Sequence, residues 1–308
     1  MVRAIVAVVL LIGLLVLRRH LGDRRIDLSA LTVLFAPINR IRFYFRRRLA
    51  FSRGTPVLEH ESKDEAFAYL KASERRKAER EIDRLVLRYP KGVPEMGPVS
   101  AYRECLYVLA CLDAYALVHV PKAERVRVVD VGSKDFVYAS ALAAFARRAA
   151  SARHVELTGV EIDGNVIYDD LFTRADHGRA HAALAHAQAV YEVADFLAFR
   201  AKKPIHLVTF FYPFVTRFAL LRWGLPASEL RPEELFAHAV DMLDDNGILV
   251  VVNHTHEERD ILRAMLDKMT ELTLLDGGPL TSNLVDYYED VPERFASVYR
   301  RRGRATGC

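Results

Sequence analysis

The alternation of strand-like and helix-like segments after Pro121 is the feature that most constrains the fold of this chain. Short runs rich in β-branched residues alternate with longer segments of helical periodicity, which is typical of a parallel sheet covered by helices on both faces. The predicted strands are residues 126–131, 155–162, 189–193, 205–211, 247–253, 272–275 and 295–300. The predicted helices among them are residues 137–150, 179–187, 232–243 and 257–269.

Size and cysteine usage fit an intracellular globular protein. Of the 308 residues, 51% are hydrophobic, so the chain can bury a large core and form one sizeable domain with attachments. Cys105, Cys111 and Cys308 have neither the number nor the spacing of a disulfide framework or a zinc site. We therefore expect a reducing compartment, with these cysteines in the core or the tail.

The basic charge is concentrated at the N-terminus. Residues 1–55 carry eleven arginines and two aspartates, a net charge of +9, which leaves −5 for the remainder. The apolar run "AIVAVVLLIGLLVL" lies in the same region and predicts a transmembrane or membrane-anchor segment over residues 1–20. A cleaved signal peptide fits less well, because "RRHLGDRR" follows instead of a small-residue cleavage site. Positive charge after the run predicts a membrane-anchored protein with its main domain on the cytoplasmic side, and anionic lipid is a better partner than nucleic acid.

Residues 21–98 are predicted to be a basic and charged helical region with a linker, and residues 99–308 the main domain. In the first of these, one helical face carries Ile38, Ile41, Phe45 and Leu49 among arginines. Such a helix either lies in a membrane interface or docks on its own domain, and the pattern alone leaves both open.

Two more helices precede the alternating region. Ser62 and Glu65 predict a capping box at the start of a charged helix with a narrow apolar stripe. "PKGVPEMGP" then interrupts the chain, and Ser100 is predicted to cap a second helix that ends before Pro121.

A strand, a tight turn and a helix follow one another in "VRVVDVGSKDFVYASALAAFARR", residues 126–148. Gly132 lets the chain turn sharply and lets a ligand approach bare backbone. A nucleotide site of this kind normally has further glycines, whereas "SKDF" follows here.

From Val126 to Arg302 the motifs resemble, in order, those of the class I S-adenosylmethionine-dependent methyltransferases. The matching stretches are "VVDVG", "LTGVEID", "YEVADFL", "IHLVTFFYPF", "LFAHAVDMLDDNGILVVVNH" and the closing pair "LTLLDGGPL" and "RFASVYRR". The resemblance implies an α/β three-layer sandwich with a mostly parallel seven-stranded sheet, preceded here by an N-terminal helical region. It also implies that S-adenosylmethionine binds across the carboxyl ends of the first strands.

The first motif carries three of the implied cofactor residues. Gly132 would approach the amino-acid part of the cofactor, and Asp130 would hold the turn or the cofactor ammonium through water. Lys134 and Phe136 stand where the family commonly has glycine, so the site requires both side chains to point away from the cofactor. Lys134 is also placed to meet the cofactor carboxylate.

The next two strands carry the implied nucleoside residues. Glu161 matches the acid that binds the ribose hydroxyls, with Asp163 as a competing candidate. Asp195 matches the position that binds the adenine amino group, with Phe196 available to flank the ring. An N-cap role is the alternative for Asp195.

The acceptor side is predicted from the fourth and fifth strands. The Asn-Pro-Pro-aromatic motif of relatives that methylate nucleic acid or protein is absent from "TFFYPF", which favours a small or lipid-like molecule over those substrates. Tyr212 lies in this aromatic stretch, which equally suits core packing. His254 is a candidate general base for an oxygen nucleophile, so we predict Tyr212 and His254 as the catalytic pair.

Other histidines are weaker candidates. His254, His256 and Glu257 lack a third placed metal ligand, so no metal is predicted. His177 and His181 are interpreted as surface or lid residues within "YDDLFTRADHGRAHAALAHA".

Three functional classes follow from the sequence. The first is a membrane-tethered methyltransferase for a small or lipid-like acceptor. The second is a methyltransferase-like scaffold without catalysis, which the "GSKDF" loop favours. The third, a nicotinamide enzyme, is disfavoured because GxGxxG is absent.

Overall fold

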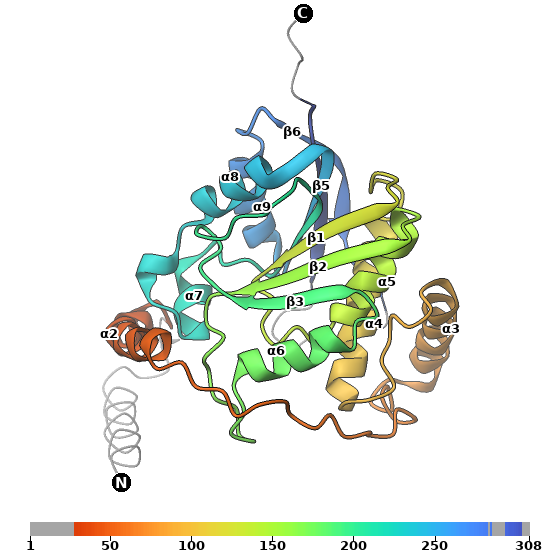
Figure 1. Cartoon of the computed structure of the whole chain (residues 1–308), viewed down its shortest axis with the longest axis horizontal. Helices are drawn as coiled ribbons and strands as arrows, with labels where there is room; N and C mark the ends of the chain where they lie inside the picture. The colour runs from red at the N-terminus through yellow and green to blue at the C-terminus, as the bar shows by residue number, and fades with distance from the viewer. Residues whose placement is uncertain (1–27, 283, 285–292, 304–308) are drawn as a thin grey trace, which may run out of the picture.

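The structure is a computed structural model that describes residues 28–282, 284 and 293–303. Its centre is a seven-stranded sheet in the order β3-β2-β1-β4-β5-β7-β6 (Figure 1). The strands are β1 (Arg125–Val131), β2 (His154–Glu161), β3 (Gln188–Val193), β4 (Ile205–Phe211), β5 (Leu243–Asn253), β6 (Leu272–Pro279) and β7 (Phe295–Arg301).

Five neighbouring strands are parallel, and β7 runs antiparallel to both β5 and β6. Parallel strands joined by helical crossovers are buried on both faces, which explains the near-continuous apolar runs of β1, β4 and β5. The predicted α/β fold with a mostly parallel seven-stranded sheet is therefore confirmed.

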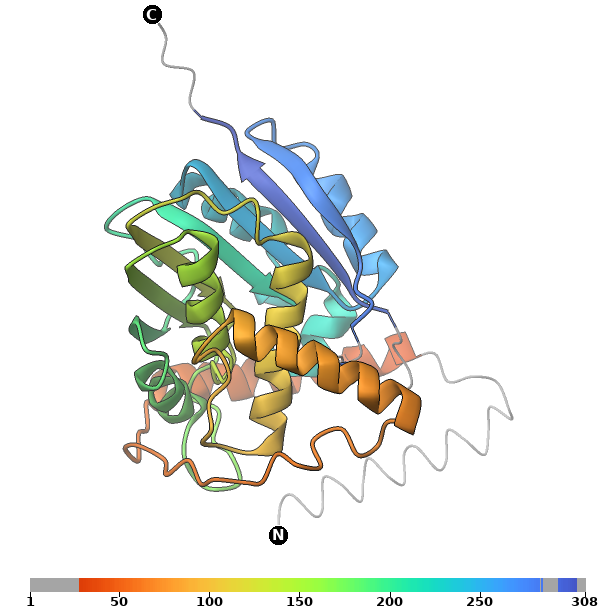
Figure 2. The same cartoon turned by 90° about the vertical axis from the view of Figure 1, so that its right-hand side faces the viewer.

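Helices cover both faces of the sheet, as the two views in Figure 1 and Figure 2 show. On one face α5 (Ala139–Ala149) packs on β1 and β2, α4 (Val99–Tyr115) packs on α5, and α3 (Ala72–Arg88) packs on α4. The alanine-rich sequence of α5, "ASALAAFARRA", lets it lie close to its neighbours, and nearly all of it is buried. On the other face α8 (Pro232–Met242) and α9 (His256–Leu266) pack on β5.

Three further helices gather at the carboxyl edge of the parallel strands. They are α2 (Leu28–Arg48), α6 (Arg174–Ala183) and α7 (Arg217–Trp223), and a 3-10 turn at Ala227–Glu229 follows α7. α2 packs on α7, and α6 packs on β3 and α5. These helices determine what can reach the strand ends.

Several predicted boundaries change in the structure. The capping box at Ser62 is wrong, because α3 begins at Ala72 with Lys71 as its N-cap and the Ser62 hydroxyl bonds Asp64 instead. α6 begins at Arg174, five residues before the predicted start, because Thr173 and Asp176 form a capping box there.

The transmembrane helix predicted from the sequence is not found in the part of the chain that the structure describes. No helix among residues 28–282, 284 and 293–303 is long and apolar enough to cross a bilayer. α2 is 21 residues long, but Arg40, Arg42 and the run at 46–48 interrupt its apolar character. The segment for which the span was predicted, residues 1–20, lies outside the described residues.

The position of Gly159 in β2 gives a first testable prediction. A Cβ at Gly159 would lie 2.9 Å from two ring carbons of Phe136 and from Ser133 Oγ. Because Phe136 is fully buried, we expect Gly159→Ala to lower the free energy of unfolding by about 1–3 kcal/mol. Urea unfolding of the variant measures this cost. In a Phe136→Leu background the cost should shrink, and an equal cost in both backgrounds would contradict the assigned contact.

Candidate functional site

The parallel strands bring the predicted site residues to one edge of the sheet. Asp130 lies near the end of β1, Glu161 ends β2, Asp195 follows β3, Tyr212 follows β4 and His254 follows β5. Because β3, β2, β1, β4 and β5 are neighbours in the sheet, residues up to 124 positions apart in the sequence, from 130 to 254, share this edge. Ligands of open α/β sheets bind at this edge.

The loop after β1 turns at Gly132, which has a φ of 75°. A Cβ built on Gly132 would meet no atom within 4 Å, so the space beside its backbone is open. Lys134 and Phe136 also have positive φ, at 52° and 54°. The loop thus uses left-handed backbone at positions where glycine would be easier.

The two bulky residues of this loop have partners elsewhere in the fold. Phe136 is fully buried, packing against Tyr138 and Tyr191. The Lys134 ammonium is 4.0 Å from the carboxylate of Glu104 on α4, and its backbone N–H donates to Glu161 Oε2 at 2.9 Å. Phe136 is therefore turned into the core, while the contact of Lys134 with a cofactor carboxylate stays a prediction.

Asp130 is fully buried near the end of β1 and forms hydrogen bonds within the fold. Its carboxylate accepts hydrogen bonds from the hydroxyls of Tyr138, at 2.8 Å, and Thr209, at 2.6 Å. Burial raises the pKa of Asp130 to about 7. Asp130 thus ties the end of β1 to β4 and to the residue before α5, and its contact with the cofactor ammonium stays a prediction.

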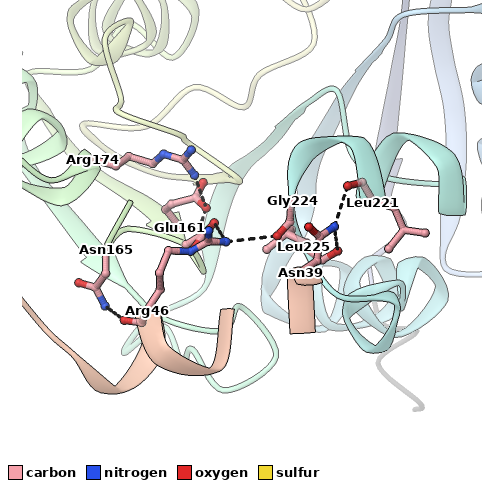
Figure 3. Close-up of polar contacts among 9 residues, drawn as sticks. Asn39, Arg46, Glu161, Asn165, Arg174, Leu221, Gly224 and Leu225 are labelled. Carbon is pink, nitrogen blue, oxygen red and sulfur yellow. Dashed lines mark hydrogen bonds and ion pairs between the residues drawn. The ribbon is translucent and has the colours of Figure 1, made fainter. Parts of the chain in front are cut away.

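Glu161 and Asp163 are each paired with an arginine, and Figure 3 shows Glu161 between Arg174 and Arg46. The Glu161 carboxylate accepts the backbone N–H groups of Lys134 and Asp163, both at 2.9 Å, and lies 3.5 Å from the Arg174 guanidinium. Arg46 of α2 makes a two-pronged contact with Asp163, from Nε at 2.8 Å and from Nη2 at 2.7 Å. Burial raises the pKa of both carboxyl groups, while the arginines act in the opposite direction.

Asp195, after the next strand, also accepts hydrogen bonds from a backbone N–H and from an arginine. Its carboxylate accepts the Leu197 N–H at 3.0 Å and an Arg231 guanidinium N–H at 2.9 Å. Phe196 is buried against Phe199 and Phe210, so its ring belongs to the core and does not face the strand edge. Each of the three candidate acids is thus paired with an arginine from another element.

Tyr212 and His254, the predicted catalytic pair, are in direct contact. Their rings stack with centroids 3.7 Å apart and an interplanar angle of 10°. The Tyr212 hydroxyl donates to the hydroxyl of Tyr107 on α4. Tyr212 has a φ of 60°, a conformation that costs a bulky residue about 1–2 kcal/mol and is common at functional sites.

The protonation states of this pair follow from their surroundings. Burial, and then the nearby Arg294, lower the pKa of His254 to about 4. Burial raises the pKa of Tyr212. At neutral pH the imidazole is therefore uncharged and has a free lone pair for a proton, while the phenol keeps its proton.

The remaining candidates have structural partners. The imidazole of His177 contacts Asp170 and that of His181 contacts the Asp135 carbonyl, each at 2.8 Å. Phe211 packs on Tyr138, so part of the aromatic stretch "TFFYPF" belongs to the core. Among the described residues, no group of three or more His, Cys, Asp or Glu side chains is placed to hold a metal ion.

Four contributors to the site were not predicted from the sequence. They are Arg46, Arg174, Arg231 and Tyr107, which lie 117, 13, 36 and 105 positions from their partners. Only Arg174 had a nearby signal, because the Thr173 and Asp176 capping box fixes the start of its helix.

The residues present fit S-adenosylmethionine in kind. An open glycine turn, a carboxylate at the end of β2 and another after β3 match the needs of its amino-acid part, ribose and adenine. Two surface cavities, of about 490 Å³ and 580 Å³, are lined by other residues, around Glu124 and Arg147 respectively. At the position predicted for the nucleoside, Asp163 and Glu161 are instead covered by Arg46 and Arg174.

The strand order and the antiparallel β7 define the fold of the class I S-adenosylmethionine-dependent methyltransferases, as the resemblance implies. No protein-family model and no curated protein matches this chain.

Solved structures that are similar include three methyltransferases. NodS, an N-methyltransferase from Bradyrhizobium japonicum in complex with S-adenosyl-L-homocysteine, is 12% identical, with 73% of this chain and 98% of that chain covered and a TM-score of 0.39. A class I methyltransferase of uncertain assignment from Listeria monocytogenes is 12% identical, with coverages of 78% and 73% and a TM-score of 0.44. An O-methyltransferase from Thermotoga maritima is 12% identical, with coverages of 74% and 73% and a TM-score of 0.39. At these values the assignment of the fold rests on the topology of the chain itself.

Proposed function

We propose that this protein is an S-adenosylmethionine-dependent methyltransferase that acts on a small or lipid-like acceptor. The observation that carries the proposal is the convergence of the Gly132 turn, Glu161 and Asp195 at the carboxyl edge of the sheet. Bound there, the cofactor supplies an electrophilic methyl group. Glu161 binds the ribose hydroxyls, Asp195 binds the adenine amino group, and the turn admits the amino-acid part.

The acceptor side of the proposal rests on the ring stack of Tyr107, Tyr212 and His254. Aromatic faces suit an apolar acceptor. The uncharged imidazole of His254 is placed to accept a proton from an oxygen nucleophile, although its low pKa limits its strength as a base.

One observation favours a second candidate, a binding protein or scaffold without catalysis. Glu161, Asp163 and Asp195 are all paired with arginines of the same chain. If those pairs are permanent, the nucleoside position is filled by the protein itself.

Calorimetric titration of the full chain distinguishes these functions. We expect micromolar binding of S-adenosylmethionine and S-adenosylhomocysteine and none of NAD. Absence of binding to all three favours the scaffold, and binding of NAD alone contradicts the proposed cofactor.

Cofactor labelled in its methyl group then tests the acceptor. The label should reach apolar hydroxylated compounds, and its transfer to RNA or protein instead would refute the acceptor class.

A further inference from the structure

The arginines over the nucleoside position come from elements outside the sheet. The Asp163 side chain is 1% exposed and that of Arg46 is 18% exposed, so Arg46 lies on the solvent side of the acid. Arg174 and Glu161 are 8% and 6% exposed. A ribose cannot reach Glu161 while both layers stay in place.

α2 is held on the domain by one narrow face. Asn39 donates to the carbonyls of Leu221, at 2.7 Å, and Leu225, at 3.1 Å, at the end of α7. Arg46 also donates to the Gly224 carbonyl at 3.2 Å, and Phe43 is buried among the leucines of that region. Carbonyl groups at a helix end lack partners within the helix, which makes α7 a suitable seat.

The opposite face of α2 is exposed. It carries the residues predicted from the sequence to share one side, Ile38, Ile41, Phe45 and Leu49, which are 42–67% exposed. α2 does dock on the domain, but not through the apolar face that the sequence pattern singled out, and a role of that exposed face in a membrane interface stays a prediction. The docked face is the one through Asn39, Phe43 and Arg46, which are spaced three or four residues apart. Figure 3 shows the contacts of Asn39 and Arg46.

A separate anchor follows the end of α2. The Ser52 hydroxyl donates to Asp176 of α6 at 2.5 Å, and the Arg53 N–H donates to the same carboxylate at 3.2 Å. Residues 49–51 between Arg48 and this anchor are irregular and exposed. They form a short connection about which α2 can turn while the chain beyond stays attached.

We propose that α2 is a cover over the nucleoside position, that the Arg46 and Asp163 pair is its latch, and that α2 leaves its seat to admit and release the cofactor. This inference rests on the proposed function. It assigns a role in cofactor exchange to α2, a helix that lies outside the sheet and its motifs. Opening exchanges the guanidinium over Asp163 for solvent and exposes the carbonyl groups of α7 to water. The exchange rate of the cofactor is then set by α2.

Arg46→Gln and Asn39→Ala each weaken the docking of α2, at different contacts, and Arg46→Lys is an intermediate case. Arg46→Gln removes the latch, and Arg46→Lys keeps the charge but loses the two-pronged contact. Asn39→Ala releases the α7 seat without touching any acid. Arg40→Gln is the matched control, because Arg40 is an exposed arginine of the same helix.

The chain contains its own reporter for the measurement. Trp223, the single tryptophan, lies on α7 with its ring 5.2 Å from the Arg174 guanidinium carbon. Stopped-flow tryptophan fluorescence with S-adenosylhomocysteine gives association and dissociation rates in the full chain. Hydrogen exchange of residues 35–48 without ligand reports the opening of α2 itself.

We expect Arg46→Gln and Asn39→Ala to speed both association and dissociation by about 10–100-fold and to accelerate exchange in α2. Arg46→Lys should fall between Arg46→Gln and the wild type, and Arg40→Gln should match the wild type. Binding by the variants but not by the wild type would also support the cover, held shut in the wild type.

Two results would overturn the cover. Wild-type binding with unchanged rates in both opening variants removes the cover and leaves the proposed function intact. Absence of binding by the wild type and by every variant removes the proposed function together with the cover.

Discussion

Replacing Glu161 with alanine should reduce the affinity for S-adenosylhomocysteine by about 100-fold or more. The proposed ribose contacts are two hydrogen bonds to a charged acceptor, each contributing on the order of 1.5–3 kcal/mol. Titration calorimetry of the full chain measures the loss. This is the largest effect expected on binding, because the carboxylate is buried and water cannot replace it without entering the site.

Glu161→Ala also leaves Arg174 buried without its partner, which destabilises the fold independently. Glu161→Gln therefore accompanies it, since it keeps the volume and an acceptor for the Lys134 N–H. We expect Glu161→Gln to bind at least about tenfold more weakly than the wild type with normal circular dichroism. Full affinity in Glu161→Gln, with loss only in Asp163→Asn, would transfer the ribose role to Asp163.

The strands could be predicted from the sequence because their signal is local. The central strands β1, β2, β4 and β5 each contain a short apolar run in which β-branched residues fit a sheet buried on both faces. The helix ends were predicted less accurately, because the capping hydrogen bonds that fix a helix end are not evident from hydrophobic periodicity. Ser62 has the sequence pattern of an N-cap, but its hydroxyl bonds Asp64. Thr173 and Asp176 form the capping box of α6, in a segment where the sequence analysis considered only the histidines.

The conformation of the loop after β1 could be predicted only in part from its sequence. Lys134 and Phe136 stand where related proteins have glycine, and by that comparison they look incompatible with a bound cofactor. In the structure Phe136 occupies the space that Gly159 leaves in β2, so the glycine missing from the loop has a counterpart 23 positions from Phe136. A side chain and the gap that receives it can be matched only when the strand register is known.

The arginine partners of the acids are the part of the site that the sequence could not supply. Charge runs such as "FRRR" at the end of α2 look like a solvated face, and nothing near Arg46 in the sequence indicates Asp163. A contact between residues 117 positions apart depends on how α2 crosses the strand ends. The acids were predictable because strand ends mark them, and their partners were not because packing places them.

Asp130→Asn should make the protein more stable at high pH and change its stability least at low pH. Asp130 has a pKa of about 7 in the fold because of burial, whereas an unfolded aspartate has a pKa of about 3.9. As pH rises from about 4 to 7, the unfolded chain loses this proton first, so the wild type loses stability on the order of 4 kcal/mol. Asparagine carries no charge to bury, and the hydroxyls of Tyr138 and Thr209 can rotate to meet its amide.

Urea unfolding of wild type and Asp130→Asn at intervals from pH 4.5 to pH 8 measures this difference, in which the titration of all other groups cancels. Asp113→Asn is the matched control on α4. Burial opposes ionisation of Asp113, but hydrogen bonds from Tyr89, Arg88 and Arg84 outweigh it and hold its pKa below the ordinary value. Because an unfolded aspartate has a pKa of about 3.9 and the pKa of Asp113 in the fold is lower still, its stabilisation is fully present across this range. The advantage of Asp130→Asn should therefore grow with pH, while the deficit of Asp113→Asn stays nearly constant. A constant difference between Asp130→Asn and the wild type across this range would show that Asp130 is ionised in the fold throughout, as an exposed acid would be.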